Sequence, residues 1–285
     1  MKSIAFGQYY PAESPIHRLD ARVKVILAIL YIVCTFLCQG VLDFAVLALS
    51  SVLLILLSRI PVRIILRAIR PILFIMIFTA VINLFLTKGE GALLLVHWTV
   101  IPAWGWTVQI YDAGIYNAVF MVIRIMVLIL GTSIFLTYTT TPIELTDAIE
   151  SLLAPLRVLH LPVHEFAMMM SIALRFIPTL MEETSKIMNA QKARGVDFAH
   201  GNLIKRAKAL VPILIPLFVS SFRRADELAT AMECRCYRGG KGRTKMRVPH
   251  LRAADVLAVL LMVAFGTGIV LLNVFGTDWI GLAWI

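Results

Sequence analysis

The chain has 285 residues, of which 60% are hydrophobic and only 15% are charged, and its mean hydropathy is +0.86. Soluble domains carry about 25% charged residues, so this composition excludes an ordinary soluble domain and indicates an integral membrane protein. The net charge is nevertheless +10, from 27 Lys and Arg against 17 Asp and Glu, and in a membrane protein such an excess predicts basic segments on the cytoplasmic side.

The N-terminal part is expected to form a hairpin of two membrane spans. A spanning helix needs about 20 apolar residues, and the apolar runs Arg22–Cys38 and Val41–Ser58 are separated only by Gln39 and Gly40. The polar residues before them lack the short basic start and apolar core of a cleavable signal. The four cysteines, at positions 34, 38, 234 and 236, do not resemble the disulfide framework of a secreted protein.

An interfacial helix and a third span are expected next. Arginines recur at helical spacing in residues 59–70, "RIPVRIILRAIR", with isoleucines between them. This pattern is typical of a helix that lies at the cytoplasmic surface with its arginines toward lipid phosphates. Pro71–Thr87 is then the third span.

Two further spans are expected later in the chain. Lys88–Asp112 carries few basic residues and several aromatic ones, which indicates a loop at the outer membrane interface. Gly114–Thr137 is the fourth span and Ala253–Phe275 the fifth, which places the C-terminus outside. Arg124 lies midway along the fourth span, where a charge is a functional candidate. The sequence leaves open whether this arginine forms a structural ion pair or lies on a substrate path.

The segment between the last two spans differs from them in composition. Residues 138–252 carry a charge every few positions and are rich in Lys and Arg, so we expect them in the cytoplasm. Thr141, followed three residues later by Glu144, has the pattern of a helix N-cap with a capping box. Two apolar stretches, Leu161–Phe176 and Leu210–Ser221, are compatible with buried, tilted or interfacial helices.

A long amphipathic helix is expected from Pro178 to Gly195. Proline favours the first turn of a helix and glycine favours the position just after its end. The adjacent acidic residues Glu182 and Glu183 are expected to face the cytoplasm and to pair with Lys186.

These segments predict an all-α, polytopic membrane protein with short transmembrane helices and long amphipathic cytoplasmic helices. We expect a membrane domain of four spans with its N-terminus in the cytoplasm, then a cytoplasmic or interfacial helical segment, then a C-terminal transmembrane helix with an outer tail. The boundaries of these three parts are residues 1–137, 138–252 and 253–285.

The stretch Ala231–Arg247, "AMECRCYRGGKGRTKMR", raises three chemical possibilities. A P-loop needs GxxxxGK[ST] after a strand, and this spacing is missing, so we expect no ATP binding by this chain. Structural zinc needs four ligands, whereas Cys234 and Cys236 lie one residue apart at a helix end, which favours packing. Nucleic-acid binding needs aromatic side chains for stacking, and Tyr237 is the only one in this stretch. The basic residues at 241, 243, 245 and 247 are typical topology charges or lipid contacts.

Arg235 in this stretch has a counterpart in Arg194. Both follow a small residue and precede another at the end of an amphipathic helix, in "AMECRC" and "AQKARG". The helix dipole favours a cation there, and that alone would explain one such arginine. Two such ends on one cytoplasmic face predict docking sites for acidic grooves, because the arginine fork suits carboxylates. The candidate docking residues are Ala193, Arg194, Gly195, Cys234, Arg235 and Cys236.

Five motifs spread along the chain resemble one protein family. They are "LDARVK", "TPIELTDAIESLLAPL", "LPVHEFAMMMSIALRFIPTLMEE", "AQKARG" and "RRADELATAMECRCYRGG". Together they resemble the transmembrane T component of energy-coupling factor (ECF) transporters, a branch of the ABC importers. The resemblance implies that residues 193–195 and 234–236 end two coupling helices, each docked in a groove of an ATPase subunit with its arginine against an acidic residue. The second end departs from the Ala-Arg-Gly pattern at both small positions but keeps the arginine.

The resemblance also implies partners and a location. We expect a multi-pass protein of the bacterial plasma membrane that binds two ABC-type ATPase subunits and a small, exchangeable substrate-binding membrane subunit for vitamins or transition-metal ions. ATP would close the ATPase pair, bring the coupling helices together and reorient the substrate-binding subunit. The chain is expected to bind no nucleic acid and no cofactor, since ATP and Mg²⁺ would be bound by the partner subunits.

Two rival classes remain. A conventional ABC permease also docks a cytoplasmic helix on an ATPase, but it lines its own substrate path, whereas this chain pairs two docking helices with spans that hold few polar groups. A membrane enzyme would need a catalytic cluster, and the sequence contains no HExxH, no GxSxG and no convergent acid/base set. We therefore expect no catalysis by this chain alone. The sequence does not name the substrate, because specificity would lie in the partner.

Overall fold

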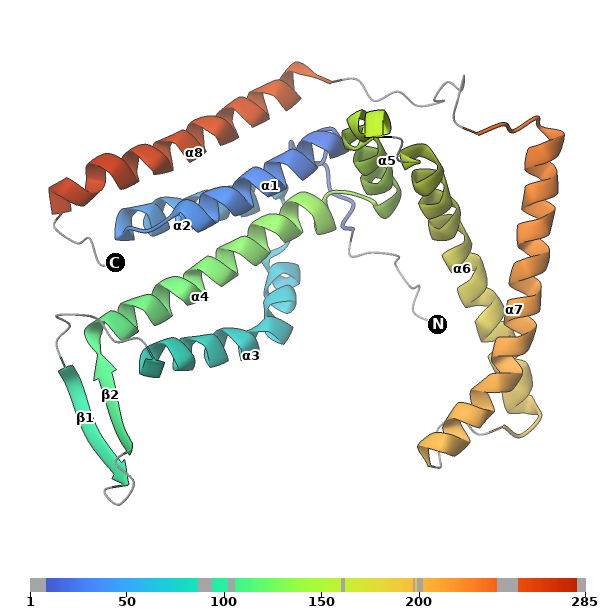
Figure 1. Ribbon diagram of the computed structural model, residues 1–285, viewed down its shortest axis with the longest axis horizontal. Coiled ribbons are helices and arrows are strands. Elements are labelled where there is room, and N and C mark those ends of the chain that lie inside the picture. Colours follow the sequence, from blue (N-terminus) through green and yellow to red (C-terminus); the bar gives the residue numbers. More distant parts are fainter. Residues whose placement is uncertain are drawn as a thin grey trace. The chain divides into compact units, whose positions relative to one another are not determined.

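The computed structural model describes residues 9–86, 94–101, 106–159, 162–196, 198, 202–239 and 251–280. Helices dominate this part of the chain (Figure 1), which confirms the all-α prediction, and one two-stranded hairpin accompanies them. The α-helices are α1 (Ala21–Leu37), α2 (Val41–Ser58), α3 (Val62–Leu86), α4 (Asp112–Thr132), α5 (Pro142–Leu152), α6 (Val163–Ala193), α7 (Leu203–Cys234) and α8 (Ala253–Ile280). A π-helical segment, η1 (Ser133–Tyr138), extends α4, and a 3₁₀ segment, η2 (Ala154–Leu159), follows α5.

The chain divides into two compact units, which we describe separately. The membrane unit comprises Met1–Leu145 together with Pro249–Ile285, and the helix-pair unit comprises Thr146–Val248.

The membrane unit holds the candidate spanning helices of the described residues. Three stretches are long and apolar enough to cross a membrane, namely Val41–Ser58, Gly114–Tyr138 and Ala253–Phe275. The expected first span, α1, has 17 residues, and the apolar stretch Ile69–Phe85 of α3 is also short.

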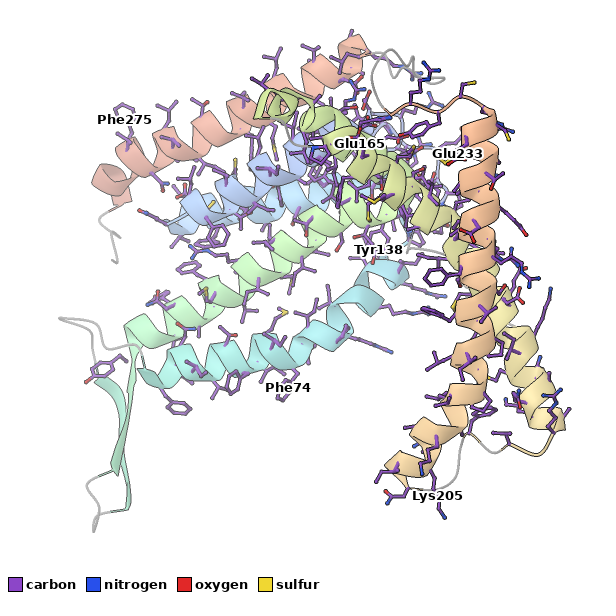
Figure 2. All side chains as sticks on the ribbon, turned by 45° about the vertical axis from the view of Figure 1, so that its right-hand side comes forward. Phe74, Tyr138, Glu165, Lys205, Glu233 and Phe275 are labelled. Atoms are coloured by element: carbon purple, nitrogen blue, oxygen red, sulfur yellow. The ribbon has the colours of Figure 1, made fainter. Side chains whose placement is uncertain are left out.

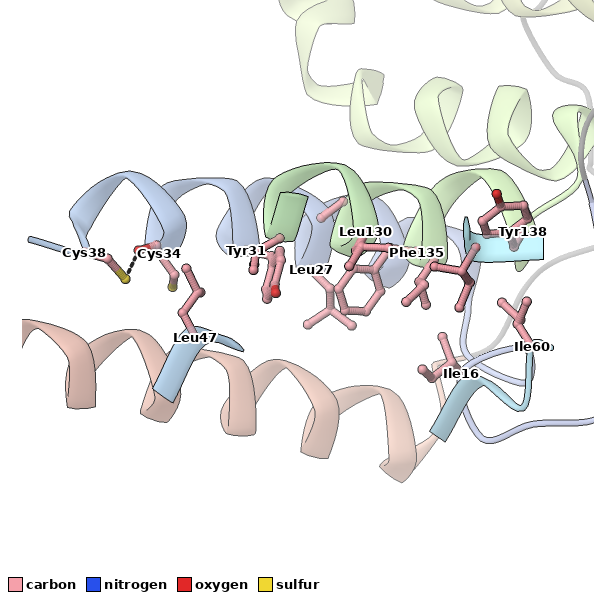
Figure 3. Packing of buried hydrophobic residues seen from close by; sticks show 14 of the residues in the cluster. Ile16, Leu27, Tyr31, Cys34, Cys38, Leu47, Ile60, Leu130, Phe135 and Tyr138 are labelled. Atoms are coloured by element: carbon pink, nitrogen blue, oxygen red, sulfur yellow. Dashed lines mark hydrogen bonds between the residues drawn. The ribbon is translucent and has the colours of Figure 1, made fainter. Parts of the chain in front are cut away.

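The core of the membrane unit lies where α1 packs against α4 and α8. Leu27 and Tyr31 of α1 are buried there together with Leu130 and Phe135 of the α4–η1 helix (Figure 3). The Tyr31 and Phe135 rings pack edge to face, with their centroids 6.1 Å apart. Gly131 makes the close approach of α1 and α4 possible, because a Cβ at that position would collide with the Tyr31 ring.

The expected interfacial helix and third span form one helix in the structure. α3 continues through Pro71, and Figure 1 shows it bending along its length. An interior proline removes one backbone hydrogen bond and kinks a helix, but it does not have to end the helix when packing continues on both sides. Arg63, Arg67 and Arg70 are exposed along α3. Arg59 instead ends α2 in the left-handed conformation, with φ 53°.

The segment expected as an outer loop contains a β-hairpin. β1 (Leu94–Ile101) pairs antiparallel with β2 (Trp106–Tyr111), with His97 opposite Gln109 and irregularities in the register near both ends of β1. The aromatic and β-branched residues that indicated a membrane interface also favour strands, which is why the sequence did not indicate a hairpin within this connection; its place at the outer interface stays a prediction. Residues 87–93 and 102–105 lie outside the described part.

The motif "LDARVK" ties three parts of the membrane unit together. Asp20 caps α1, since its carboxylate accepts a hydrogen bond from the Arg22 amide at 2.9 Å. The Asp20 amide donates to the carboxylate of Asp255, in the first turn of α8, at 2.9 Å. Buried Lys24 donates to the carbonyl of Thr139, just after η1, at 2.7 Å. The start of α1, the start of α8 and the end of η1 therefore meet at one end of the membrane unit.

Candidate docking site

The predicted capping box at the start of α5 is confirmed. The Thr141 amide donates to the Glu144 carboxylate at 3.2 Å, and the Glu144 amide donates to the Thr141 hydroxyl at 3.3 Å. In the helix-pair unit, the ring Nδ1 of His164 lies 3.1 Å from the carboxylate of Glu150. This contact joins the start of α6 to the end of α5.

Two long helices make up most of the helix-pair unit. α6 is one helix of 31 residues and α7 one helix of 32, so the expectation that a helix begins at Pro178 is wrong. The apolar stretch before Pro178 belongs to α6, and Leu210–Ser221 belongs to α7, which continues through Pro212 and Pro216. An interior proline costs about 3 kcal/mol. The packing of α6 against α7 outweighs this local preference.

The two helices pack against each other in opposite directions. An ion pair joins them, in which the Arg224 guanidinium donates to the Glu183 carboxylate at 2.9 Å. Glu183 therefore pairs with Arg224 instead of with Lys186, the partner expected from the spacing along α6. Figure 2 shows Lys205 and Glu233 at opposite ends of α7, with Glu165 of early α6 toward the Glu233 end. The C-terminal ends of α6 and α7 therefore lie at opposite ends of the pair.

α6 ends in a Schellman motif around Arg194. The Val196 amide donates to the Gln191 carbonyl at 3.1 Å, and the Gly195 amide donates to the Lys192 carbonyl at 3.0 Å. Gly195 takes the left-handed conformation that this motif requires, with φ 86°. The prediction that Gly195 directly follows the helix end is therefore confirmed.

α7 ends in the same motif around Arg235. The Tyr237 amide donates to the Met232 carbonyl at 3.0 Å, and the Cys236 amide donates to the Glu233 carbonyl at 2.8 Å. Cys236 is also left-handed, with φ 57°, a conformation that costs a residue other than glycine about 1–2 kcal/mol. Sequence reasoning missed this feature, because glycine and not cysteine is the usual signal for it.

Both helix ends satisfy their own carbonyl groups and leave their arginines available. Backbone amides already occupy the carbonyls of each last turn, so neither guanidinium is needed as a cap. Within the described residues, we find no hydrogen bond or ion pair of the Arg194 or Arg235 side chain. Such a guanidinium can bind a carboxylate through two parallel hydrogen bonds. The six candidate residues are all exposed: Ala193, Arg194, Gly195, Cys234, Arg235 and Cys236.

Arg124 has a structural role in the membrane unit. Its guanidinium donates to the carbonyl of Cys38, just after α1, at 2.7 Å, and lies 5.2 Å from the centroid of the Phe44 ring. The neighbouring carbonyl of Leu37 accepts a hydrogen bond from the Asn273 side chain at 2.6 Å. Side chains of α4 and α8 therefore cap α1. In the described residues Arg124 contacts a backbone carbonyl and not a carboxylate, so the structure shows a structural contact other than the ion pair considered above.

Comparison with known proteins identifies the family. The family model described as cobalt transport protein, CbiQ, matches residues 12–246. The energy-coupling factor transporter transmembrane protein EcfT of Ruminiclostridium cellulolyticum is 49% identical over 96% of this chain and 98% of its own length. The chain belongs to the EcfT family. Two other EcfT proteins are similarly close. That of Clostridium kluyveri is 49% identical over 91% of this chain and 93% of its own length. That of Bacillus subtilis is 48% identical over 87% of this chain and 89% of its own length.

Membership in the EcfT family confirms the predicted resemblance to the T component. It makes the chain a transmembrane component of an ECF transporter, in agreement with its apolar helices. The matched residues 12–246 include both arginine-bearing helix ends. The basic residues at 241, 243, 245 and 247, interpreted above as topology charges or lipid contacts, lie outside the part that the structure describes.

Proposed function

We propose that this chain is the scaffold subunit through which two partner ATPase subunits drive a small, exchangeable substrate-binding subunit in the same membrane. ATP hydrolysis in the partners reorients that subunit and brings vitamins or other micronutrients into the cell. The observation that carries this proposal is the pair of helix ends at Arg194 and Arg235, which share one backbone motif and expose both arginines. Membership in the EcfT family supports it.

Two equivalent arginine ends favour two partners of the same kind. Small residues flank both arginines, an alanine and a glycine at the α6 end and two cysteines at the α7 end. A groove with an acidic residue can therefore close around each guanidinium without meeting a bulky neighbour. Because the two ends lie at opposite ends of the helix pair, each partner subunit would take one end.

Nucleotide chemistry belongs to the partners in this proposal. ATP and Mg²⁺ bind to the ATPase subunits, and this chain is a non-catalytic subunit of the plasma membrane that crosses the bilayer several times. When the ATPase pair closes, each groove carries its helix end with it, since a charge-assisted hydrogen bond resists separation. α6 and α7 pass this movement to the substrate-binding subunit.

Purification of the tagged full chain in mild detergent, from cells that express the intact transporter, tests the proposal. Two ATPase subunits and a small membrane protein are expected to co-purify. The double variant Arg194→Ala/Arg235→Ala should lose the ATPases and uptake while its expression stays normal. Arg223→Ala, at an exposed arginine of α7 away from its end, is the matched control and should retain both. Normal uptake by the double variant would refute the docking role.

The same cells distinguish the proposal from a conventional ABC permease. A permease that lines its own substrate path would support uptake without the small membrane protein. We expect uptake to disappear when that protein is deleted, even though the ATPase subunits remain bound to this chain.

A further inference from the structure

Away from the two docking ends, the membrane unit contains a cavity of about 400 Å³ that three arginines line. Arg18, Arg59 and Arg252 come from the turn before α1, the end of α2 and the residue before α8. They have no part in the proposed ATPase docking or in the capping of α1. Three positively charged residues that line one space repel each other, so their gathering there suits an anion.

Backbone hydrogen bonds hold two of these arginines in place. Arg59 ends α2 in the left-handed conformation, and its guanidinium donates to the Glu13 carbonyl at 3.4 Å. The Arg252 amide donates to the buried carboxylate of Asp255 at 2.7 Å, and the Asp20 amide donates to the same carboxylate at 2.9 Å. The backbone around the cavity is therefore fixed before a ligand binds, which lowers part of the ordering cost of binding.

The described residues that line the cavity carry more positive than negative charge. Among the described residues that line it, Glu13 is the one that is acidic. Its side chain is 91% exposed and lies 3.8 Å from the Arg18 guanidinium, so this ion pair is weak. Over the residues that the structure describes, neither Arg59 nor Arg252 forms an ion pair. Among the described lining residues, three arginines therefore stand against one glutamate.

The cavity lies at the ends of two candidate spanning helices. α2 ends there and α8 begins there. Leu56 and Leu57 in the last turn of α2 are exposed, and so are Val256 and Leu257 in the first turns of α8. In a bilayer, apolar side chains face the acyl chains, and basic residues at the helix ends lie among the headgroups. The surroundings therefore suit a ligand with an anionic head and an apolar tail.

We propose that this cavity binds the phosphate group of an anionic phospholipid. The planar arginine fork matches phosphate oxygens through two parallel hydrogen bonds, and basic pockets between helices at the membrane surface suit lipid headgroups. The exposed leucines and valine beside the cavity favour a lipid over inorganic phosphate, which has no apolar part to place against them. A lipid bound there bridges the N-terminal turn, α2 and α8.

Native mass spectrometry of the full chain in mild detergent tests this proposal. The unmodified chain is expected to retain one phosphatidylglycerol through washing that removes phosphatidylcholine. Arg18→Gln/Arg252→Gln, which leaves Arg59 at the end of α2, should weaken this retention at least about tenfold. The matched control Arg63→Gln/Arg67→Gln removes two exposed arginines of α3 outside the cavity and should retain the lipid.

Thermal unfolding separates a lipid from a free anion. Phosphatidylglycerol should raise the unfolding temperature of the unmodified chain above its value in phosphatidylcholine, whereas inorganic phosphate at the same concentration should not. Arg18→Lys/Arg252→Lys keeps the positive charges but removes the planar guanidinium groups, so phosphatidylglycerol should raise its unfolding temperature by a smaller amount. Equal lipid loss in the cavity and control variants, equal retention of phosphatidylcholine, or an equal shift with inorganic phosphate would each overturn the proposal.

Discussion

The last carbonyl groups of α1 receive their hydrogen bonds from a different kind of donor than those of α6 and α7. Every α-helix leaves its final carbonyls without partners inside the helix. At the end of α1, side chains of other helices supply the donors, since Arg124 reaches the Cys38 carbonyl and Asn273 reaches the Leu37 carbonyl. At the ends of α6 and α7, backbone amides of the following residues supply them.

This difference separates structural arginines from available ones. Arg124 is partly buried and engaged with the backbone of its own unit. Arg194 and Arg235 stand where the cap is already complete, and both are exposed. Substitutions at Arg124 should therefore change stability, whereas substitutions at the other two should change assembly.

The largest effect is expected from the single variants Arg194→Ala and Arg235→Ala. In the proposed docking, each variant would leave an acidic residue of one partner groove unpaired, which costs about 2–5 kcal/mol per site. ATPase affinity should fall at least about thirtyfold in each variant, and uptake should be lost, while the unfolding temperature of the purified chain stays unchanged. Binding and thermal unfolding measured on the same preparations check this prediction.

Equivalence of the two ends is part of the same prediction. Because both ends share one backbone motif, the two variants should weaken ATPase binding by similar factors. If one of the two variants still bound both ATPase subunits normally, the substituted arginine would not be a docking residue and the two helix ends would not be equivalent.

A smaller effect, on stability, is expected at Arg124. Arg124→Met keeps the length of the side chain but leaves the Cys38 carbonyl without its donor, and an unsatisfied buried polar group costs about 1–3 kcal/mol. The unfolding temperature in detergent should fall, while the folded protein binds the ATPase subunits as before. Arg124→Lys retains a hydrogen-bond donor, so its unfolding temperature should fall less than that of Arg124→Met. An unchanged unfolding temperature combined with lost uptake would place Arg124 on a substrate path instead.

The two Schellman motifs differ in their left-handed residue, which is Gly195 in one and Cys236 in the other. Substitutions at these two positions should give the next largest effect, on the stability of each helix end. A Cβ at Gly195 would meet no atom within 4 Å, so Gly195→Ala adds only backbone strain, about 1 kcal/mol. Cys236→Gly relieves this strain but gains less than about 1 kcal/mol, because glycine loses more entropy on folding. Amide hydrogen exchange in the last turn should become faster in the first variant and slower in the second.

Cys234→Ala is the control for the cysteine exchange. Cys234 is the last helical residue of α7 and carries no backbone strain, so its replacement should leave amide exchange nearly unchanged. Strong loss of uptake in Cys234→Ala or Cys236→Gly would contradict the view that these cysteines serve only as small neighbours of Arg235.

The smallest effect is expected at the ion pair between α6 and α7. The Glu183 and Arg224 side chains are 29% and 36% exposed, and such a pair contributes about 0.2–1 kcal/mol. Glu183→Gln and Arg224→Gln should each broaden the distance distribution between spin labels placed near the two helix ends. A double-mutant cycle isolates the pairwise contribution. Additive effects would mean that the two residues do not act together.

Much of the architecture follows from signals that are local in the sequence. Apolar length predicted the bounds of α2, and Gly195 predicted the end of α6, because both depend on neighbouring residues. The passage of α6 through Pro178 depends instead on packing against α7, which local propensity does not contain. The hairpin of β1 and β2 was missed because the same aromatic residues suit both a strand and a membrane interface.

The candidate site was predictable in its residues and less so in its geometry. The matching small-Arg-small patterns identified Arg194 and Arg235 as a pair. The left-handed backbone at Cys236 has no sequence signal of its own, so the identity of the two motifs appears only in the structure. The partner of Glu183 lies 41 residues away, beyond the reach of helical spacing rules.

The contact between Glu183 and Arg224 also lies at the same sequence distance from both helix-end arginines. Arg194 lies eleven residues beyond Glu183, and Arg235 lies eleven residues beyond Arg224. At about 1.5 Å per residue, each of these arms is about 16 Å long. A rotation of about 10° between α6 and α7 about this contact would swing each arginine by about 3 Å. In the proposed coupling, equal pulls on the two helix ends would therefore change the crossing angle of α6 and α7 and move both arginines by the same distance.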